Sequence, residues 1–507
     1  MTSTVLLGKT APPALAAVEL TARMGNRHGL VAGATGTGKT VSLLTLAEGF
    51  SRIGVPVFMA DVKGDVAGIA MPGTPDERVR SRLSTLGIAD HVPEANPAIL
   101  WDLFGEAGHP IRATVSEVGP ILLARMLELN DTQAGVLDIA FRVADDEGLL
   151  LLDLEDLRAV LSHLAEQRKA VSTKYGLVSA PSIAAIQRAL LRLESDGGQR
   201  FFGEPALDIA DLMRTTPDDR GVIGVLAADS LVLKPRLYST FLLWLLSELF
   251  ERLPEVGDAD RPKLVFVFDE AHLLFDDAPP ALRQRVEQVV RLIRSKGVGV
   301  YFCSQFPDDV PGEILGQLGN RIQHALRAFT PRDQKAVRVA AETFVPNPAI
   351  DVAAALTQLA TGEALVSVLS SAGVPTPVER VLIAPPRARI GPITAAERQQ
   401  LRATSPLGAR YDQALDRESA AEMLARRAET VAARPETSAP AGAARGTGSD
   451  GSERGIGDAV KDAVFGTARR QGMIETMAKQ TMRTVGNQLG RQIVRGLLGG
   501  LLGRRGR

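Results

Sequence analysis

The residues with the clearest chemical signature form the segment GATGTGKT, from Gly33 to Thr40. The segment satisfies G-x-x-x-x-G-K-[ST], follows an apolar run and precedes a helix-like stretch, which is the context of a phosphate-binding loop. Its small residues let backbone N–H groups curl around phosphate oxygens at a helix N-terminus, where the helix dipole favours an anion. In such a loop Lys39 binds the β- and γ-phosphates and Thr40 ligates Mg²⁺. The candidate nucleotide-binding residues are Gly33, Ala34, Thr35, Gly36, Thr37, Gly38, Lys39, Thr40 and Val41.

A second segment, LVFVFDEAH from Leu264 to His272, has five apolar residues followed by two carboxylates. An apolar strand that leads into Asp269 places this carboxylate at the C-terminal edge of a sheet, where it can hold Mg²⁺. Glu270 lies next to it and is expected to polarise an attacking water, which favours hydrolysis over a kinase reaction. The alternative is an ordinary strand end with solvated acids. Together the two motifs predict ATP and Mg²⁺ as cofactors.

A third segment, GVGVYFCSQFP from Gly297 to Pro307, reads as a further strand that ends in polar Ser304 and Gln305. A glutamine there can hydrogen-bond both the γ-phosphate and the attacking water, although an ordinary loop glutamine is the alternative. Cys303, the single cysteine, is more typical of a small buried hydrophobe than of a nucleophile, and it excludes an intramolecular disulfide. The candidate catalytic residues from these motifs are Glu270, Lys39 and Gln305.

Two further polar groups flank the predicted strands. Asp61, Lys63 and Asp65 follow a second apolar run, so they could line the same sheet edge or grip a partner, or form an ordinary turn. Arg27 and His28 precede the first strand and could reach the nucleotide, but a solvated or packed pair is favoured.

The elements that must position these residues alternate along the chain. Apolar runs at 29–33 and 55–60 flank a helix-like stretch at 39–51, which indicates a βαβ unit and a parallel sheet. From about 106 to 211 a Leu- and Ala-rich sequence with helical spacing predicts an all-helical insertion. Further strand signals lie at 221–227, 264–268, 298–303, 321–326 and 364–369, with an edge strand or extended arm at 375–386.

The chain is therefore predicted to be an α/β protein with a discontinuous core over 29–105 and 212–390. Residues 1–28 are expected to form a hairpin or an edge of that core. The 106–211 insertion interrupts it.

The C-terminal part has a different composition. A charged helical segment is expected at 391–434, a flexible linker at 435–457 and a basic amphipathic tail at 458–507. From residue 464 onward there are nine basic residues and one acidic residue, a net charge of +8. A basic amphipathic helix is typical of a segment that binds a membrane surface, a protein partner or nucleic acid, while a mostly disordered tail is the alternative.

Composition limits the other possibilities. The 507 residues carry 58 Lys and Arg against 59 Asp and Glu, so the formal net charge of −1 gives no global electrostatic signature of nucleic-acid binding. A secretory signal is not recognisable, and the longest apolar run, at 237–250, is too short for a membrane span. The expected location is cytoplasmic, with peripheral attachment to a membrane through the tail left open.

Five ordered segments together resemble the HerA-like P-loop ATPases of the HerA/FtsK superfamily, and the bacterial DUF853 branch most closely. The resemblance covers about residues 20–390. It implies a RecA-like P-loop NTPase core of the additional-strand type, with strand order 5-1-4-3-2, assembled as a homo-hexameric ring with ATP between subunits. The segments are NRHGLVAGATGTGKT, VPVFMADVKGDVAGIA, FVFDEAH, IRSKGVGVYFCSQFP and LGQLGNRIQHALRAFTPRDQKAV.

The resemblance also implies an arginine that acts on the nucleotide of the neighbouring subunit. Arg321, at the start of a predicted strand, is the first candidate for this catalytic role, and Arg294 and Arg327 are the next. For each of them a surface or core-pairing arginine is the alternative.

The leading functional hypothesis is an ATP-hydrolysing ring motor that translocates or remodels duplex DNA. One alternative is an ATPase that acts on protein or at a membrane surface, tethered by its basic tail. Another is a non-motor scaffold that binds ATP, against which Glu270 and Gln305 argue. Between the first two the sequence says little, because the slight negative charge of the core does not favour DNA.

Overall fold

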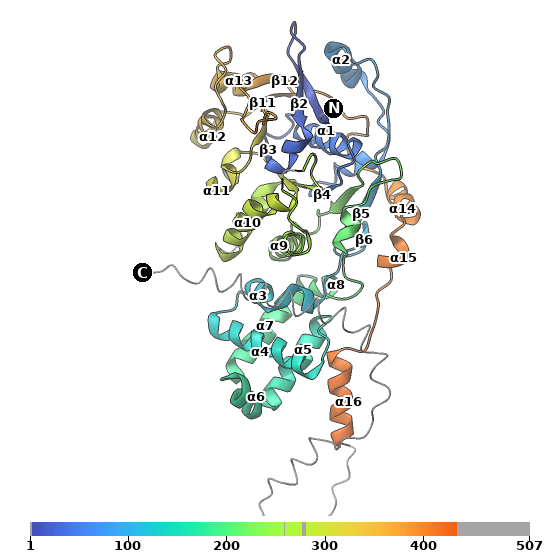
Figure 1. Cartoon of the computed structure of the whole chain (residues 1–507), viewed down its shortest axis with the longest axis vertical. Helices are drawn as coiled ribbons and strands as arrows, with labels where there is room; N and C mark the ends of the chain where they lie inside the picture. Colours follow the sequence, from blue (N-terminus) through green and yellow to red (C-terminus); the bar gives the residue numbers. More distant parts are fainter. Residues whose placement is uncertain (1–2, 258, 276–279, 433–507) are drawn as a thin grey trace, which may run out of the picture. The chain divides into compact units, whose positions relative to one another are not determined.

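The computed structural model describes residues 3–432 except 258 and 276–279 (Figure 1). The linker and the basic tail expected at 435–457 and 458–507 lie outside the described residues. The described residues form a 12-stranded sheet, in the order β2-β1-β12-β11-β10-β3-β9-β8-β4-β7-β5-β6.

The centre of the sheet is parallel. Numbering β3, β4, β8, β9 and β10 as strands 1 to 5 gives the order 5-1-4-3-2, so the predicted RecA-like fold is confirmed. Strand β7 pairs with the free side of β4 and extends the parallel region to β5 and β6. These strands are β3 (Gly29–Ala32), β4 (Val57–Asp61), β5 (Ala98–Asp102), β6 (His109–Pro110), β7 (Ile223–Ala227), β8 (Leu264–Phe268), β9 (Val298–Ser304) and β10 (Asn320–Gln323).

Antiparallel strands continue the sheet on the other side. Strand β11 (Glu363–Ser367) pairs with β10, β12 (Glu379–Ile383) with β11, and β1 (Thr4–Thr10) with β12. A hairpin between β1 and β2 (Ala17–Thr21) forms the edge. The sequence analysis missed β5, an apolar run just before the predicted helical insertion, and β6, whose two residues give no periodic signal.

Helices cover both faces of the sheet because the side chains of each strand alternate between two cores. Phe266 and Phe268 of β8 pack into one core with α9 (Pro235–Arg252) and α10 (Pro280–Ile293). Val265 and Val267 pack into the other with α1 (Lys39–Arg52). The smaller helices around the sheet are α2 (Glu77–Leu86), α11 (Gly312–Leu315), α12 (Pro331–Glu342) and α13 (Val352–Gln358).

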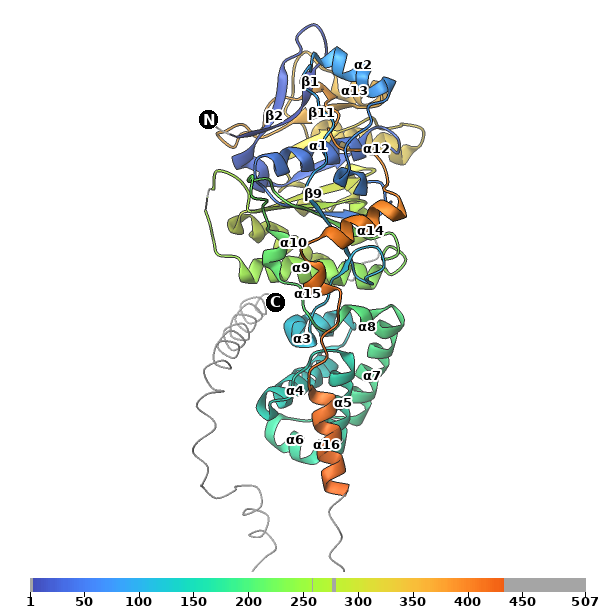
Figure 2. The same ribbon diagram turned by 90° about the vertical axis from the view of Figure 1, so that its right-hand side faces the viewer.

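Residues of the predicted insertion form a group of helices (Figure 2). Reciprocal capping boxes at Thr114, Asn130 and Asp153 give three of these helices a defined start. Arg252 of α9 forms a 3.2 Å ion pair with Glu117 of α3. The helices are α3 (Val115–Met126), α4 (Asp131–Glu147), α5 (Leu154–Glu166), α6 (Arg168–Tyr175), α7 (Ala180–Ser195) and α8 (Gly198–Phe201).

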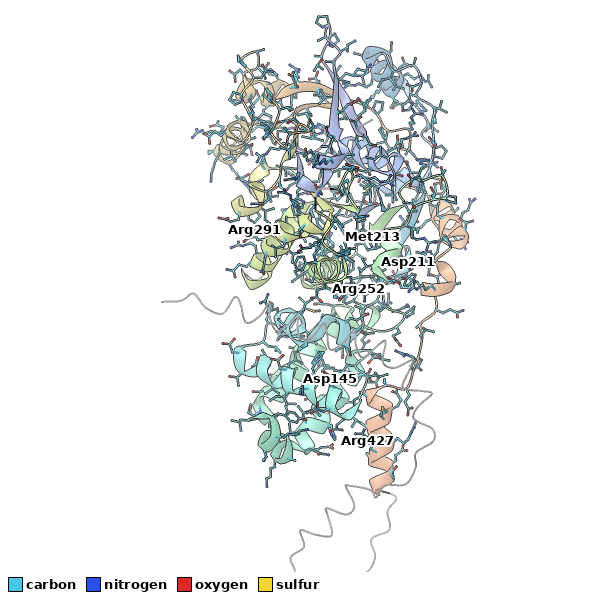
Figure 3. All side chains as sticks on the ribbon, in the orientation of Figure 1. Asp145, Asp211, Met213, Arg252, Arg291 and Arg427 are labelled. Atoms are coloured by element: carbon cyan, nitrogen blue, oxygen red, sulfur yellow. The ribbon has the colours of Figure 1, made fainter. Side chains whose placement is uncertain are left out.

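The segment after the sheet contains α14 (Ala395–Thr404), α15 (Gly408–Tyr411) and α16 (Ala420–Ala432). The ring of Tyr411 packs on Trp101 of β5 with centroids 5.3 Å apart. Arg427 of α16, which Figure 3 labels, forms a 2.6 Å ion pair with Glu147 of α4. This segment therefore contacts both the sheet and the inserted helices. In the described part of the chain, no helix has the length and apolar character needed to cross a membrane.

Candidate functional site

Polar side chains gather at the carboxyl ends of the parallel strands. The predicted phosphate-binding loop follows β3, Asp61 ends β4, Asp269 follows β8, and Gln305 follows β9. Since β3 pairs with β9, β9 with β8, and β8 with β4, these positions lie along one edge of the sheet. Ligands of open α/β sheets bind at this edge.

The loop from Gly33 to Gly38 has the backbone that a phosphate cradle requires. Gly33, Gly36 and Gly38 have φ values of 152°, 78° and 115°, which side chains rarely tolerate. A Cβ at Gly36 would meet no atom within 4 Å, so the tip of the loop faces open space. The other side of the loop is supported, because the N–H of Gly362 donates a 2.9 Å hydrogen bond to the carbonyl of Thr37.

Lys39 begins helix α1 and is only 7% exposed. Its ammonium donates to the carbonyl oxygens of Gly33 and Ala34, at 2.6 and 3.2 Å. The ammonium of Lys39 is therefore held at the loop, where it would neutralise the oxygens of a bound phosphate. Thr40, the next residue, donates a 3.1 Å hydrogen bond to Oδ2 of Asp65.

Two buried carboxylates, Asp61 and Asp269, and the half-buried Asp65 lie at the same edge of the sheet as this loop. Burial, followed by the charges of Asp65 and Asp269, raises the pKa of Asp61 to about 7. The pKa of Asp269 is also raised, first by burial and then by the charge of Glu270. Oδ1 of Asp65 is buried without a hydrogen-bond partner among the described residues. These carboxylates create an excess of negative charge that a cation would relieve.

The residues present fit Mg²⁺, which prefers oxygen ligands and keeps several waters. Thr40 offers a hydroxyl and Asp269 a carboxylate at this edge. Within residues 3–432 as described, no group of three His, Cys, Asp or Glu side chains forms a complete metal site. At Mg²⁺ sites of this kind, phosphates and waters complete the coordination shell.

Glu270 has an unusual backbone and buried charge. Its φ is 49°, and the residue is 4% exposed. Lys63 forms an ion pair with Oε1, and Nδ1 of His272 lies 3.3 Å from Oε2. Burial alone would lower the pKa of Lys63, but hydrogen bonding to Glu270 and its charge raise it above its ordinary value. Within the described part of the chain, the two carboxylate oxygens of Glu270 make these ion-pair contacts but accept no hydrogen bond that meets normal limits of distance and angle.

Gln305 directly follows the strand that neighbours the phosphate loop. Ser304, at the end of β9, accepts a 3.2 Å hydrogen bond from the N–H of Gly33 through its carbonyl. This contact brings the start of the Gln305 segment against the start of the loop. Gln305 itself is half-buried.

His324 packs against the start of the loop. The sequence analysis missed this residue. Its Nδ1–H donates to the carbonyl of Glu363 at 2.9 Å, so Nε2 accepts from the hydroxyl of Ser42 at 2.8 Å. Burial lowers the pKa of His324 to about 4, which keeps the ring neutral. A Cβ at Gly33 would lie 2.5 Å from Cβ of His324. The only signal available in the sequence was a histidine after the last parallel strand.

Arg321, the first candidate for action on a neighbouring subunit, is engaged within its own chain. Its guanidinium donates to the carbonyls of Leu318 and Leu315 at 3.3 and 3.1 Å. Arg294 and Arg327 are exposed. The role of an arginine in trans stays a prediction for all three.

His28 lies at the start of β3, the end opposite the phosphate loop. It is buried, and its Nδ1 accepts a 3.0 Å hydrogen bond from the N–H of Val300. The structure therefore places it among packed side chains rather than beside the loop.

Comparison with known proteins gives a family match. The family described as "Helicase HerA-like C-terminal" matches residues 8–507. No curated protein matches the chain.

Solved structures with a similar trace include the bacterial conjugative coupling protein TrwB in an unbound form, at 15% identity and a TM-score of 0.47. That match covers 73% of this chain and 90% of TrwB. VirB4 of Thermoanaerobacter pseudethanolicus is 16% identical with a TM-score of 0.48, over 78% of this chain and 98% of VirB4.

Proposed function

The chain belongs to the helicase HerA-like C-terminal family, and we propose that it is a P-loop ATPase that hydrolyses ATP to ADP and phosphate. The observation that carries this proposal is the meeting of the phosphate loop with the Asp269–Glu270 pair at one sheet edge. A loop that only bound phosphate would not need a second, buried carboxylate beside the proposed metal ligand.

In the proposed reaction, the oxygen of a water molecule attacks the γ-phosphorus of ATP. The bond from the γ-phosphorus to the bridging oxygen breaks, and its electron pair leaves with ADP. Glu270 accepts the proton of the water, and Gln305 orients that water against the γ-phosphate. Lys39 neutralises the β- and γ-phosphates, and the N–H groups of the loop bind their oxygens. Mg²⁺, held by Thr40 and Asp269, would supply further neutralisation of the phosphate charge.

We further propose a ring motor, built as a homo-hexamer, that translocates or remodels duplex DNA. The family description supports this, since it is that of a helicase-like domain. The intrachain bonds of Arg321 make the exposed Arg294 and Arg327 better sources of an arginine in trans. Action on protein, or at a membrane surface through the basic tail, is the alternative.

The test is ATP hydrolysis by the full-length protein with and without duplex DNA, alongside particle mass by mass photometry. Hydrolysis that disappears in Lys39→Ala supports the ATPase. Stimulation by duplex DNA together with a six-fold particle supports the DNA motor. Hydrolysis that survives unchanged in Lys39→Ala would refute the assignment, and ATPase activity indifferent to DNA would favour the protein or membrane alternative.

A further inference from the structure

The turn that follows β4 joins the two halves of the proposed site. It runs from Asp61 to Asp65, and its backbone is tied to Asp61, because Oδ1 of Asp61 accepts the N–H of Asp65 at 3.1 Å. At its end, Asp65 accepts the hydroxyl of Thr40 on the phosphate-loop side. In its middle, Lys63 reaches the other side and forms the ion pair with Glu270. One five-residue turn thus contacts both the proposed metal ligand and the proposed general base.

The ion pair opposes the role assigned to Glu270. A carboxylate that activates water must present an oxygen to that water and take its proton. Here Oε1 contacts the ammonium of Lys63 and Oε2 faces His272. In the observed arrangement, both carboxylate oxygens of Glu270 are therefore engaged by neighbouring side chains.

The ion pair between Lys63 and Glu270 can also separate. The Lys63 side chain is 41% exposed, whereas that of Glu270 is 5% exposed, so the lysine is the partner that can move into solvent. Its neighbour Gly64 has a φ of 74°, and a Cβ there would meet no atom within 4 Å. Lys39, by contrast, is buried under two carbonyl contacts. The middle of the turn thus has room to move while its two ends remain bonded.

We infer that Lys63 is a positioning residue that holds Glu270 in a resting arrangement and so slows ATP hydrolysis until the middle of the 61–65 turn moves away. This inference rests on the proposed ATPase function. It assigns to the turn a regulatory role at the same site, because displacement of one exposed lysine frees the base without disturbing the phosphate loop.

The test compares kcat and KM for ATP in full-length variants at saturating Mg²⁺. Lys63→Met removes the charge while keeping a side chain of similar length, and Lys63→Arg keeps the charge. Lys174→Met is the matched control, because Lys174 is an exposed lysine paired with Asp146 at 3.1 Å in the inserted helices. The double variant Lys63→Met/Glu270→Gln asks whether any effect passes through Glu270.

We expect Lys63→Met to raise kcat about three-fold or more, with KM changed less than about two-fold, because the base is freed while phosphate binding is kept. Lys63→Arg and Lys174→Met should resemble wild type, and the double variant should be as slow as Glu270→Gln alone. A lower kcat in Lys63→Met would overturn the inference, as would a gain that persists when Glu270 is replaced.

The same assay separates this inference from the proposed function. If wild type hydrolyses ATP, Lys39→Ala does not, and Lys63→Met is slower than wild type, only the role of Lys63 fails. If wild type and all Lys63 variants lack activity, the ATPase proposal fails and the role of Lys63 fails with it.

Discussion

Thr40 at the start of helix α1 donates a 3.1 Å hydrogen bond to Asp65, which lies 25 positions later in the turn after strand β4. The hydroxyl that the sequence pattern assigns to Mg²⁺ is thus oriented by a carboxylate that the pattern does not contain. Replacing a residue that orients a metal ligand typically costs about 10- to 100-fold in metal affinity or activity.

Asp65→Ala should therefore weaken activation by Mg²⁺. We expect the Mg²⁺ concentration for half-maximal ATPase activity to rise by about ten-fold, the lower end of typical effects of such residues. Asp65→Asn keeps an acceptor oxygen and should cause a smaller rise. The measurement is a Mg²⁺ titration of hydrolysis, with Asp131→Ala, an exposed acid of the inserted helices, as control. An unchanged midpoint in Asp65→Ala would show that Thr40 needs no such support.

Lys39 and Glu270 should separate nucleotide binding from hydrolysis. Lys39→Ala removes the counter-charge of the β- and γ-phosphates, so nucleotide binding or turnover should be lost. Glu270→Gln should still bind ATP but slow its hydrolysis by about 10² or more, as expected for loss of a general base. Equilibrium binding of a fluorescent ATP analogue, measured beside single-turnover hydrolysis, distinguishes the two. Equal loss of binding in both variants would contradict these separate roles.

The arginine that acts in trans can be found by mixing subunits. A subunit that lacks this arginine and a Lys39→Ala subunit are each inactive alone, but a mixed ring contains some intact composite sites. We expect partial restoration of hydrolysis with Arg294→Ala or Arg327→Ala.

Arg321→Ala should not be complemented. Instead it should lower the free energy of unfolding by about 1–3 kcal/mol, because the carbonyls of Leu315 and Leu318 lose a charged donor. Restoration in the Arg321→Ala mixture, with unchanged stability, would return this residue to the trans role.

Acid should destabilise the fold through buried His28. Its pKa in the folded protein is lowered by burial from 6.5 to about 4, so between these values the unfolded chain binds a proton that the folded chain does not. The stability that neutral His28 contributes is therefore present above pH 6.5 and is lost as the pH falls toward about 4.

Replacing the titrating ring tests this. In His28→Gln the fall in unfolding free energy between pH 6.5 and 4 should be smaller than in wild type. The variant must be compared with wild type because the raised pKa of Asp61, about 7, makes both proteins more stable as the pH falls. The effect of Asp61 is the same in both and cancels in the comparison. Urea unfolding at several pH values provides the measurement, with His163→Gln as control. Parallel pH profiles for His28→Gln and wild type would refute the prediction.

The central fold could be predicted because its strands are apolar runs, each followed by polar residues of recognisable type. Strands β3, β8 and β9 are buried, so their sequences are nearly continuous apolar stretches. Strand β6 has only two residues and gave no such signal, and the place of β5 is decided by pairing with β7, which lies more than 100 residues later. Local sequence does not specify such long-range pairing.

Contacts between residues of the site were harder to predict from the sequence than the motifs themselves. Lys63 and Glu270 are each visible as polar residues after a strand, but their ion pair depends on β4 and β8 being neighbours and on the positive φ of Glu270. Arg321 was singled out from its position before a strand. Its side-chain direction depends on where the carbonyls of α11 lie, which no spacing rule provides.

The tail from residue 458 onward should act on binding rather than on hydrolysis. Its net charge of +8 from residue 464 follows a segment rich in Gly, Ser and Pro, while the motifs of the ATPase site all precede residue 330. Deleting 458–507 should leave basal ATPase activity within about two-fold but weaken binding to polyanionic surfaces, because release of counterions drives such binding.

Duplex DNA and anionic liposomes, each tested with full-length and truncated protein at roughly 50 and 200 mM salt, separate the possible ligands of the tail. Binding to DNA should fall with salt with a logarithmic slope of about −0.9 per phosphate neutralised, and truncation should reduce that slope. On anionic lipid each basic residue near the surface should contribute about 1 kcal/mol. Loss of liposome binding alone would favour a membrane-attached ATPase over the DNA motor. If truncation changes neither, the polyanion hypothesis fails, and a change in particle mass would then identify the tail as an assembly segment.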